Sequence, residues 1–174
     1  MNLTSTVSGS TFAWTCTPSS PLLGGFTAGN GNLISQTLNN TGYTIETVTY
    51  HITPTANGCD GPVANYIVTV NPKPDVSNNP LSSQICSGTS PNIALLSNVA
   101  GTNFSWTATG SSPNITGYGP GSGLFINKVL TNLGLSIETV TYHVTPSANG
   151  CSGITVDYVV TIVSIPDVYF LPPS

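Results

Sequence analysis

Few residues of this chain carry side chains suited to acid–base, nucleophilic or metal chemistry. Its 174 residues include two histidines, four cysteines, six carboxylates and two lysines, and there is no arginine. Histidine is the usual acid–base group near neutral pH and a common metal ligand, and cysteine supplies a nucleophile, a metal ligand or a disulfide. What these groups can do depends on their spacing and on the elements that hold them.

The two histidines occupy equivalent places in a stretch that the chain contains twice. Residues 45–54 read IETVTYHITP, and residues 137–146 read IETVTYHVTP. His51 and His143 fall on the polar face of a predicted strand, with only threonines nearby on that face. We therefore expect exposed or sheet-packed histidines, and neither a general base nor a ligand.

Other patterns that would indicate an active site are incomplete. Residues 119–123 read GPGSG, in which the serine is misplaced for the Gly-x-Ser-x-Gly turn of serine hydrolases. The Gly-x-Gly pairs at Gly29–Gly31 and Gly121–Gly123 have no helix after them and predict tight turns. Zinc would need paired Cys/His spacing that is absent. We predict no catalytic residue, no metal ligand and no cofactor, and we expect no enzyme.

The carboxylates are spread thinly along the chain. They are Glu46, Asp60, Asp75, Glu138, Asp157 and Asp167. Calcium needs several converging oxygen ligands, so Asp75 or Asp167 with backbone carbonyls would give at best a weak site. An isopeptide cross-link is not expected, because Lys128 becomes Gln36 in the other copy of the repeat.

Composition excludes several partners. Charged residues make up 5% of the chain, against about 25% in an average soluble protein. The net charge of −4 and the shortage of cations argue against nucleic acid and anionic membranes. No apolar run reaches the roughly 18 residues that a membrane helix needs. The first four residues show no secretory signal, so an exported chain is expected to be an internal piece of a longer protein.

The duplication covers nearly the whole chain. The same shift of 92 positions places Trp14 on Trp106 and Tyr66 on Tyr158, and roughly half of the 82 overlapping positions are identical without a gap. A period of this length indicates two copies of a small domain. We predict domains at residues 1–72 and 73–166, with residues 167–174 as a linker toward a further copy.

Apolar and polar residues alternate in strand-like fashion, and no segment has a helical period. We predict an all-β chain of two tandem immunoglobulin-like antiparallel β-sandwiches in line. Cys16 stands beside Trp14 where the other copy has Ala108, so we expect a small buried residue. The expected core aromatics are Phe12, Trp14, Tyr50, Phe104, Trp106 and Tyr142.

The first copy is expected to lack its first strand. Residues 83–92 of the second copy have no counterpart before Met1. Whether that strand comes from the same chain or from a neighbouring one, as in donor-strand assembly, stays open.

Several of these motifs together resemble a known family. They are the stretch TVTYHVTPSANGCSG from Thr139, the ICSG at residues 85–88, the Phe-x-Trp strand and the Pro-x-Pro at residues 72–74. They are similar to PKD-like, immunoglobulin-like repeats of very large Bacteroidota surface adhesins exported by type IX secretion, SprB-like gliding adhesins among them. The resemblance implies an extracellular, cell-surface stalk or filament that extends an adhesive tip for attachment or gliding. Neighbouring repeats, and surface glycans or the secretion and gliding machinery, would be its partners.

An immunoglobulin-like fold also bears on the cysteines. The start of such a domain and the turn that joins its last two strands can lie at one end, so we predict a disulfide between Cys86 and Cys151. Cys59 has no upstream partner in the first copy. The strand of Cys16 should run away from the turn with Cys59, so no bridge is expected there.

Aromatic residues in or near loops suggest an alternative function. Phe26, Tyr43, Tyr118 and Phe125 are candidates for a sugar-binding platform, as in a pair of carbohydrate-binding modules of a secreted polysaccharide-degrading protein. However, Phe26/Tyr118 and Leu33/Phe125 stay apolar in both copies, which favours a packing role for them.

Overall fold

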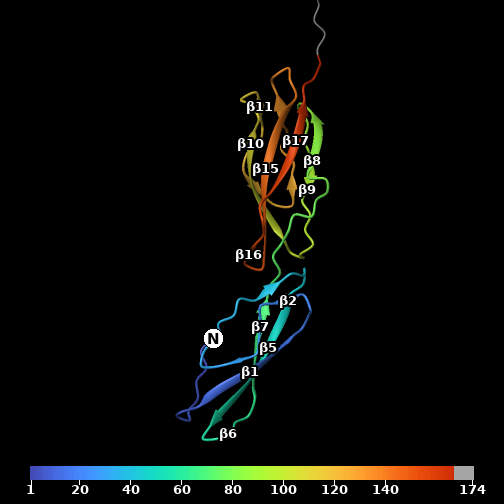
Figure 1. Ribbon diagram of the computed structural model, residues 1–174. Helices are drawn as coiled ribbons and strands as arrows, with labels where there is room; N and C mark the ends of the chain where they lie inside the picture. The colour runs from blue at the N-terminus through green and yellow to red at the C-terminus, as the bar shows by residue number, and fades with distance from the viewer. Residues whose placement is uncertain (167–174) are drawn as a thin grey trace, which may run out of the picture. The chain divides into compact units, whose positions relative to one another are not determined.

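The computed structural model describes residues 1–166, and the predicted linker at residues 167–174 lies outside them. The chain divides into two compact units, unit 1 (Met1–Lys73) and unit 2 (Pro74–Ser174). In the described part all regular elements are strands, which confirms the all-β prediction (Figure 1). Accordingly, no helix there is long and apolar enough to cross a membrane.

Unit 1 is built around one long strand. Its strands are β1 (Thr11–Pro18), β2 (Leu23–Gly24), β3 (Gly29–Asn30), β4 (Asn39–Asn40), β5 (Glu46–Ala56), β6 (Cys59–Asp60) and β7 (Ala64–Val70). Strand β5 pairs with β1 on one side and with β6 and β7 on the other, while β3 extends the sheet beyond β1. The hairpin turns at Asn57–Gly58, whose φ values of 51° and 78° suit Asn-Gly.

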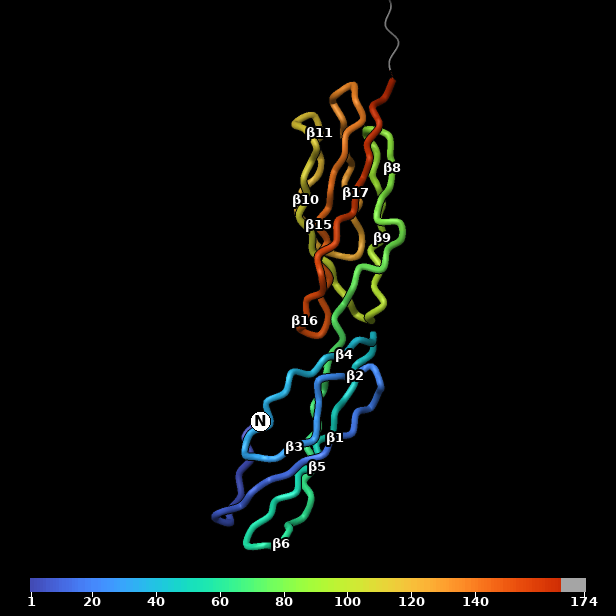
Figure 2. Tube along the Cα trace, viewed as in Figure 1, coloured from blue at the N-terminus to red at the C-terminus, as the bar shows by residue number. Residues whose placement is uncertain are grey.

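Unit 2 repeats this plan and adds a strand. Its strands are β8 (Ser82–Cys86), β9 (Ile93–Ala94), β10 (Asn103–Gly110), β11 (Ile115–Thr116), β12 (Gly121–Ser122), β13 (Phe125–Ile126), β14 (Thr131–Asn132), β15 (Glu138–Ala148), β16 (Cys151–Ser152) and β17 (Val156–Val163). The main sheet has the order β12-β10-β15-β17-β8. Strand β8 lies parallel to β17 along its outer edge, as Figure 2 shows. This pair departs from the expected antiparallel sandwich.

The core of unit 2 lies between the main sheet and a second layer of short strand pairs. Ile93 and Ile126 come from the β9–β13 pair, and Ile115 comes from the β11–β14 pair. They pack in one cluster with inward residues of β15 such as Val140 and Val144. Both β5 and β15 alternate in burial along their first half, which is the two-residue period expected when one face of a strand is buried.

Five of the six predicted core aromatics are buried, and the sixth, Trp106, packs against the core but is only half-buried. Phe12, Trp14, Tyr50, Phe104 and Tyr142 are all at most 8% exposed. In unit 1 the indole N–H of Trp14 donates to the backbone oxygen of Thr27, which also accepts from Gln36. The counterparts of Thr27 and Gln36 are Gly119 and Lys128, so the amide bond from Gln36 has no equivalent beside Trp106.

The equivalent tyrosines Tyr50 and Tyr142 differ in how their hydroxyls are satisfied. Tyr50 Oη donates to Gln36 Oε1 at 2.9 Å. Tyr142 Oη is buried without a hydrogen-bond partner in the described protein. Burial raises the pKa of Tyr142 to about 12. The folded state therefore holds the tyrosine proton to a higher pH than the unfolded chain, whose tyrosines titrate near about 10.

We expect Tyr142→Phe to leave unit 2 as stable as before or slightly more stable at neutral pH, because a buried unpaired hydroxyl is removed. Tyr50→Phe should destabilise unit 1 by about 1 kcal/mol, because it breaks a hydrogen bond. Unit 2 should also lose stability as pH rises from about 10 to about 12, since only the unfolded state releases the proton there. Urea unfolding at pH 7, 10 and 11 measures this. A pH dependence that Tyr142→Phe leaves undiminished would assign the titration to another group.

Candidate functional site

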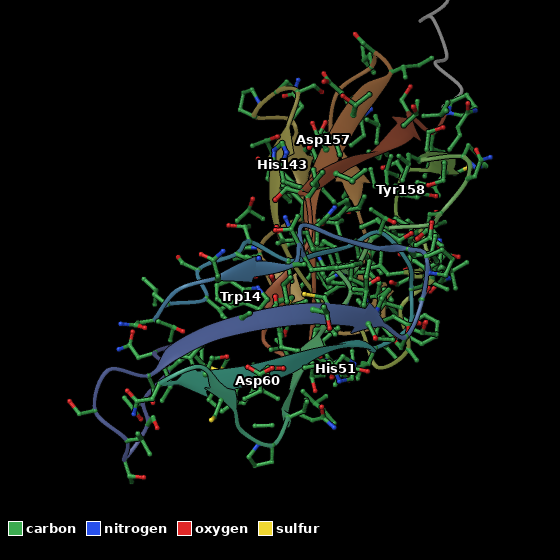
Figure 3. All side chains as sticks on the ribbon, turned by 60° about the horizontal axis from the view of Figure 1, so that its bottom comes forward. Trp14, His51, Asp60, His143, Asp157 and Tyr158 are labelled. Carbon is green, nitrogen blue, oxygen red and sulfur yellow. The ribbon has the colours of Figure 1, made fainter. Side chains whose placement is uncertain are left out.

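A row of hydrogen-bonded side chains crosses the outer face of the unit 2 sheet. His143 on β15 bonds through Nδ1 to Asp157 Oδ1 on β17 at 2.6 Å, and through Nε2 to Thr109 Oγ1 on β10 at 3.2 Å. Figure 3 shows His143 and Asp157 side by side on neighbouring strands. The side chains of His143 and Asp157 are 34% and 60% exposed. The row thus spans three strands at the surface.

Unit 1 carries the same row with one chemical change. His51 bonds through Nδ1 to Asn65 Oδ1 at 2.7 Å, and through Nε2 to Thr17 Oγ1 at 3.0 Å. The carboxylate of Asp157 is therefore an amide at the equivalent position. Each histidine borders a shallow surface hollow, of about 190 Å³ beside His51 and about 300 Å³ beside His143.

The order hydroxyl, imidazole, carboxylate is that of a hydrolase triad, in which the carboxylate orients the imidazole and stabilises its charged form. An amide accepts the Nδ1–H bond equally well but supplies no negative charge. Both units keep the same geometry, so what they share is the hydrogen-bonded connection of three strands. Water also reaches Asp157, which weakens its electrostatic effect on His143. We interpret the row as a cross-strand connection.

The carboxylate at this site is predicted to be dispensable. Asp157→Asn should change the free energy of unfolding of unit 2 by no more than about 0.5 kcal/mol, because an exposed ion pair contributes little and the amide keeps the hydrogen bond. Asn65→Asp is the matched exchange in unit 1, with the same small effect expected. Urea unfolding of both variants, followed by tryptophan fluorescence, measures it. A loss of 2 kcal/mol or more in either would show that charge matters here.

The expectation that the histidines have only threonine neighbours is wrong. Beside the Asn57–Gly58 turn, Ala56 pairs with Cys59. If that register continued along the hairpin, Ala64 would lie opposite His51. One extra residue in the segment 61–63 shifts the pairing, so that His51 faces Asn65. This bulge is the physical reason that the third member of the row was missed.

The predicted Cys86–Cys151 disulfide is also wrong, and all four cysteines are free thiols. Cys86 pairs beside Val163, near the end of β17. Cys151 pairs with Ala148 in the hairpin at the opposite end of the sheet. About ten strand residues separate the two ends, roughly 33 Å at 3.3 Å per residue. A disulfide requires Cα atoms within about 7 Å.

Cys16 is half-buried, and not the fully buried residue that was expected. Its thiol lies 3.3 Å from the backbone oxygen of Thr27, and burial raises its pKa. The register separates Cys16 from Cys59, since Cys16 faces Tyr50 and Cys59 faces Ala56 on β5.

Three carboxylates accept hydrogen bonds from neighbouring loops. Hydrogen bonds from Ser19 and then Thr44 lower the pKa of Glu46. A bond from Ser111 does the same for Glu138. Partial burial acts to raise the pKa of Asp75, but bonds from Asn98 and Ser97 outweigh it and the net shift is downward.

These bonds leave Asp75 poorly placed as a calcium ligand, because both its oxygens already accept protein donors. Residues 1–166 contain no group of three or more His, Cys, Asp or Glu side chains able to hold a metal. Asp167 lies outside the described residues.

The four candidate sugar-binding aromatics divide into two pairs. Phe26 and Tyr118 are half-buried against the two cores. Tyr43 and Phe125 are 55% and 59% exposed. The packing role expected at the Leu33/Phe125 position is wrong, since Leu33 is also exposed. The next residue in each copy is buried instead, as strand alternation requires.

Comparison with known proteins agrees with the division into two units. A protein-family model described as PKD-like domain matches residues 1–74 and 83–166. A search of curated proteins gave no match. The two matched segments cover most of the chain, one in each unit. They confirm the prediction of two tandem immunoglobulin-like β-sandwiches.

Proposed function

The chain belongs to the PKD-like domain family, and from this premise we propose that it is a load-bearing repeat in the stalk or filament of a large cell-surface adhesin. The resemblance to type IX-secreted adhesins of Bacteroidota supports a role in surface attachment or gliding. The tandem duplication supports it too, because a spacer gains reach from every added copy. The exposed histidine rows support it as well, since their common property is to hold strands together.

The observation that carries the proposal is the parallel pairing of β8 and β17, the first and last described strands of unit 2. Val159 N–H donates to Leu81 O at 3.1 Å, and Ser87 N–H donates to Val163 O at 2.9 Å. Tyr158 Oη adds a bond to Ser82 O at 3.2 Å. Tension on the two ends of the unit pulls β8 and β17 in opposite directions along their length. The hydrogen bonds between them then share the load and must break together.

Side-chain packing reinforces this seam. Tyr158, Val160 and Ile162 on β17 are at most 7% exposed and belong to the core cluster. Leu81 and Ile85 pack against the same cluster from the β8 side. Sliding β8 along β17 therefore also exposes apolar surface to water, which opposes extension.

Stretching single molecules of the full chain by its ends tests the proposal. We expect two unfolding events, with unit 2 the more resistant, because in unit 1 no described strand forms such a seam with β7. In unit 2, Ser83→Pro should lower the unfolding force by about half or more. The backbone N–H groups alternate in direction along β8, and that of Ser83 points at β17, so proline removes a hydrogen bond of the seam.

Gln84→Pro is the matched control for that experiment. Its N–H points to the outer edge, where proline is tolerated, so the unfolding force should stay close to that of the unchanged chain. If both variants unfold at the original force, the seam does not bear the load and the proposal fails.

The exposed Tyr43 and Phe125 favour one alternative, a pair of carbohydrate-binding modules. Aromatic faces stack on apolar faces of sugars, and each of these side chains is more than half accessible. Binding of the chain to a glycan array, lost in Tyr43→Ala or Phe125→Ala, would support this function over the stalk.

A further inference from the structure

The outer edge of β7 in unit 1 is unpaired among the described residues. Strand β7 pairs with β5 on one side only. Tyr66, on the inner face of β7 with Val68 and Val70, is 49% exposed. Exposed strand edges of this kind present free backbone donors and acceptors to other strands.

In unit 2 the corresponding edge, that of β17, is covered by β8. There β8 lies parallel to β17, with Val159 opposite Ser82 and Thr161 opposite Gln84. Tyr158, the counterpart of Tyr66, is only 7% exposed. Since Val159 N–H donates to Leu81 O, the Val159 and Thr161 amides point away from β15. By equivalence, the Ile67 and Thr69 amides of unit 1 point to its open edge.

Two hollows flank Tyr66 where β8 would lie. One, of about 350 Å³, is bordered by Met1–Ser5 and by Phe12, Ile52 and Tyr66. The other, of about 290 Å³, is bordered by Ile34, Leu38, Tyr50, Tyr66 and Val68. The unit 2 counterparts of the second set belong to a core against which Leu81 and Ile85 pack. The hollows in unit 1 thus correspond to places that apolar side chains of β8 cover in unit 2.

We propose that the β7 edge of unit 1 is a binding site for an extended peptide strand of the β8 type, which adds parallel to β7. The occupant carries apolar side chains at the positions of Leu81 and Ile85, for the two hollows, and uncharged polar residues between them. Strand β7 contains no charged residue. A charged side chain on the added strand would therefore lose its contact with water without gaining an ion-pair partner. This inference rests on the duplication and is independent of the proposed function.

The first experiment uses the full chain and a synthetic peptide of residues 81–92 with Cys86→Ser, which prevents disulfide formation. Hydrogen exchange should show at least tenfold slowing at the Ile67 and Thr69 amides, with no change at Val159 and Thr161. A peptide with Ile85→Asp in addition should give no protection, because its charge would enter an apolar hollow. Unchanged exchange at Ile67 and Thr69 with saturating peptide would overturn the proposal.

The second experiment makes the contact intramolecular by fusing residues 81–92, with Cys86→Ser, directly before Met1. The shift of 92 positions makes this the register that unit 2 has. The unfolding temperature of unit 1 should rise by about 5 °C or more. Thr69→Pro in the fused chain removes a backbone N–H at the outer edge of β7 and leaves the hydrogen bonds between β7 and β5 in place. It should abolish most of the rise in unfolding temperature.

A second copy of the chain is the competing occupant. Sedimentation of the unextended chain over a hundredfold concentration range tests for it. Suppose that the chain forms a dimer in which the Ile67 and Thr69 amides are protected without peptide, and that added peptide does not dissociate it. That result would assign the edge to self-association and refute the proposal. A monomer that becomes protected only with peptide supports it.

Discussion

Phe104→Ala should destabilise unit 2 by about 3 to 5 kcal/mol, the range for truncating a buried phenylalanine. Phe104 is 3% exposed on β10 and packs in the cluster between the main sheet and the short strand pairs. Removing the ring leaves a cavity that the surrounding strands cannot close without breaking their ladders. Because a small domain has about 5 to 15 kcal/mol in all, much of the stability of unit 2 would be lost.

The two tryptophans allow each unit to be followed separately. Trp14 reports unit 1 and Trp106 reports unit 2, so Trp14→Phe and Trp106→Phe backgrounds isolate the two urea transitions. Phe12→Ala is the matched change in unit 1, where Phe12 is 8% exposed. We expect Phe104→Ala to shift only the Trp106 transition. A shift of both would mean that the units do not unfold independently.

Gly117→Ala should destabilise unit 2 by about 3 kcal/mol or more, combining left-handed backbone strain with a steric clash. The φ of Gly117 is +91°, and an added Cβ would lie 2.0 Å from the backbone oxygen of Val129. Leu130, the next residue, is fully buried, so this backbone cannot move away without disturbing the core.

Gly119→Ala is the control within the same loop. The nearest atom to its added Cβ is Lys128 Nζ at 3.8 Å, an ordinary contact. We expect its free energy of unfolding to stay within about 0.5 kcal/mol of the unchanged chain. Thermal unfolding of both variants, followed through Trp106, measures the difference. Equal melting temperatures for the two variants would contradict the steric argument.

Much of the fold could be predicted because the sequence contains two copies of the domain that can be compared position by position. A residue such as Val48 or Val140 that stays apolar in both copies at a two-residue period marks the inner face of a strand, and both are fully buried. The Asn-Gly turns mark the hairpins in the same way, with positive φ at Asn57 and Asn149.

What could not be predicted depends on register and on the ends of strands. His143 meets Asp157 only because one extra residue shifts the hairpin ladder, and composition contains no sign of that shift. The disulfide prediction placed Cys86 at the start of the domain, but its strand runs parallel to β17 and carries it to the far end. The half-burial of Trp106 accompanies the change of Thr27 and Gln36 to Gly119 and Lys128, both more than ten residues from Trp106 in the sequence.

The parallel seam also sets when unit 2 can complete its folding. Tyr158 and Ser82, joined across the seam, are 76 positions apart in the chain. Contacts of such high sequence separation form late, because the intervening loop must first lose its freedom. Along the chain β8 comes long before β17, and the inner face of the sheet stays exposed to water until β17 is in place. A PKD-like unit of this design therefore completes its folding only when β17 pairs with β8.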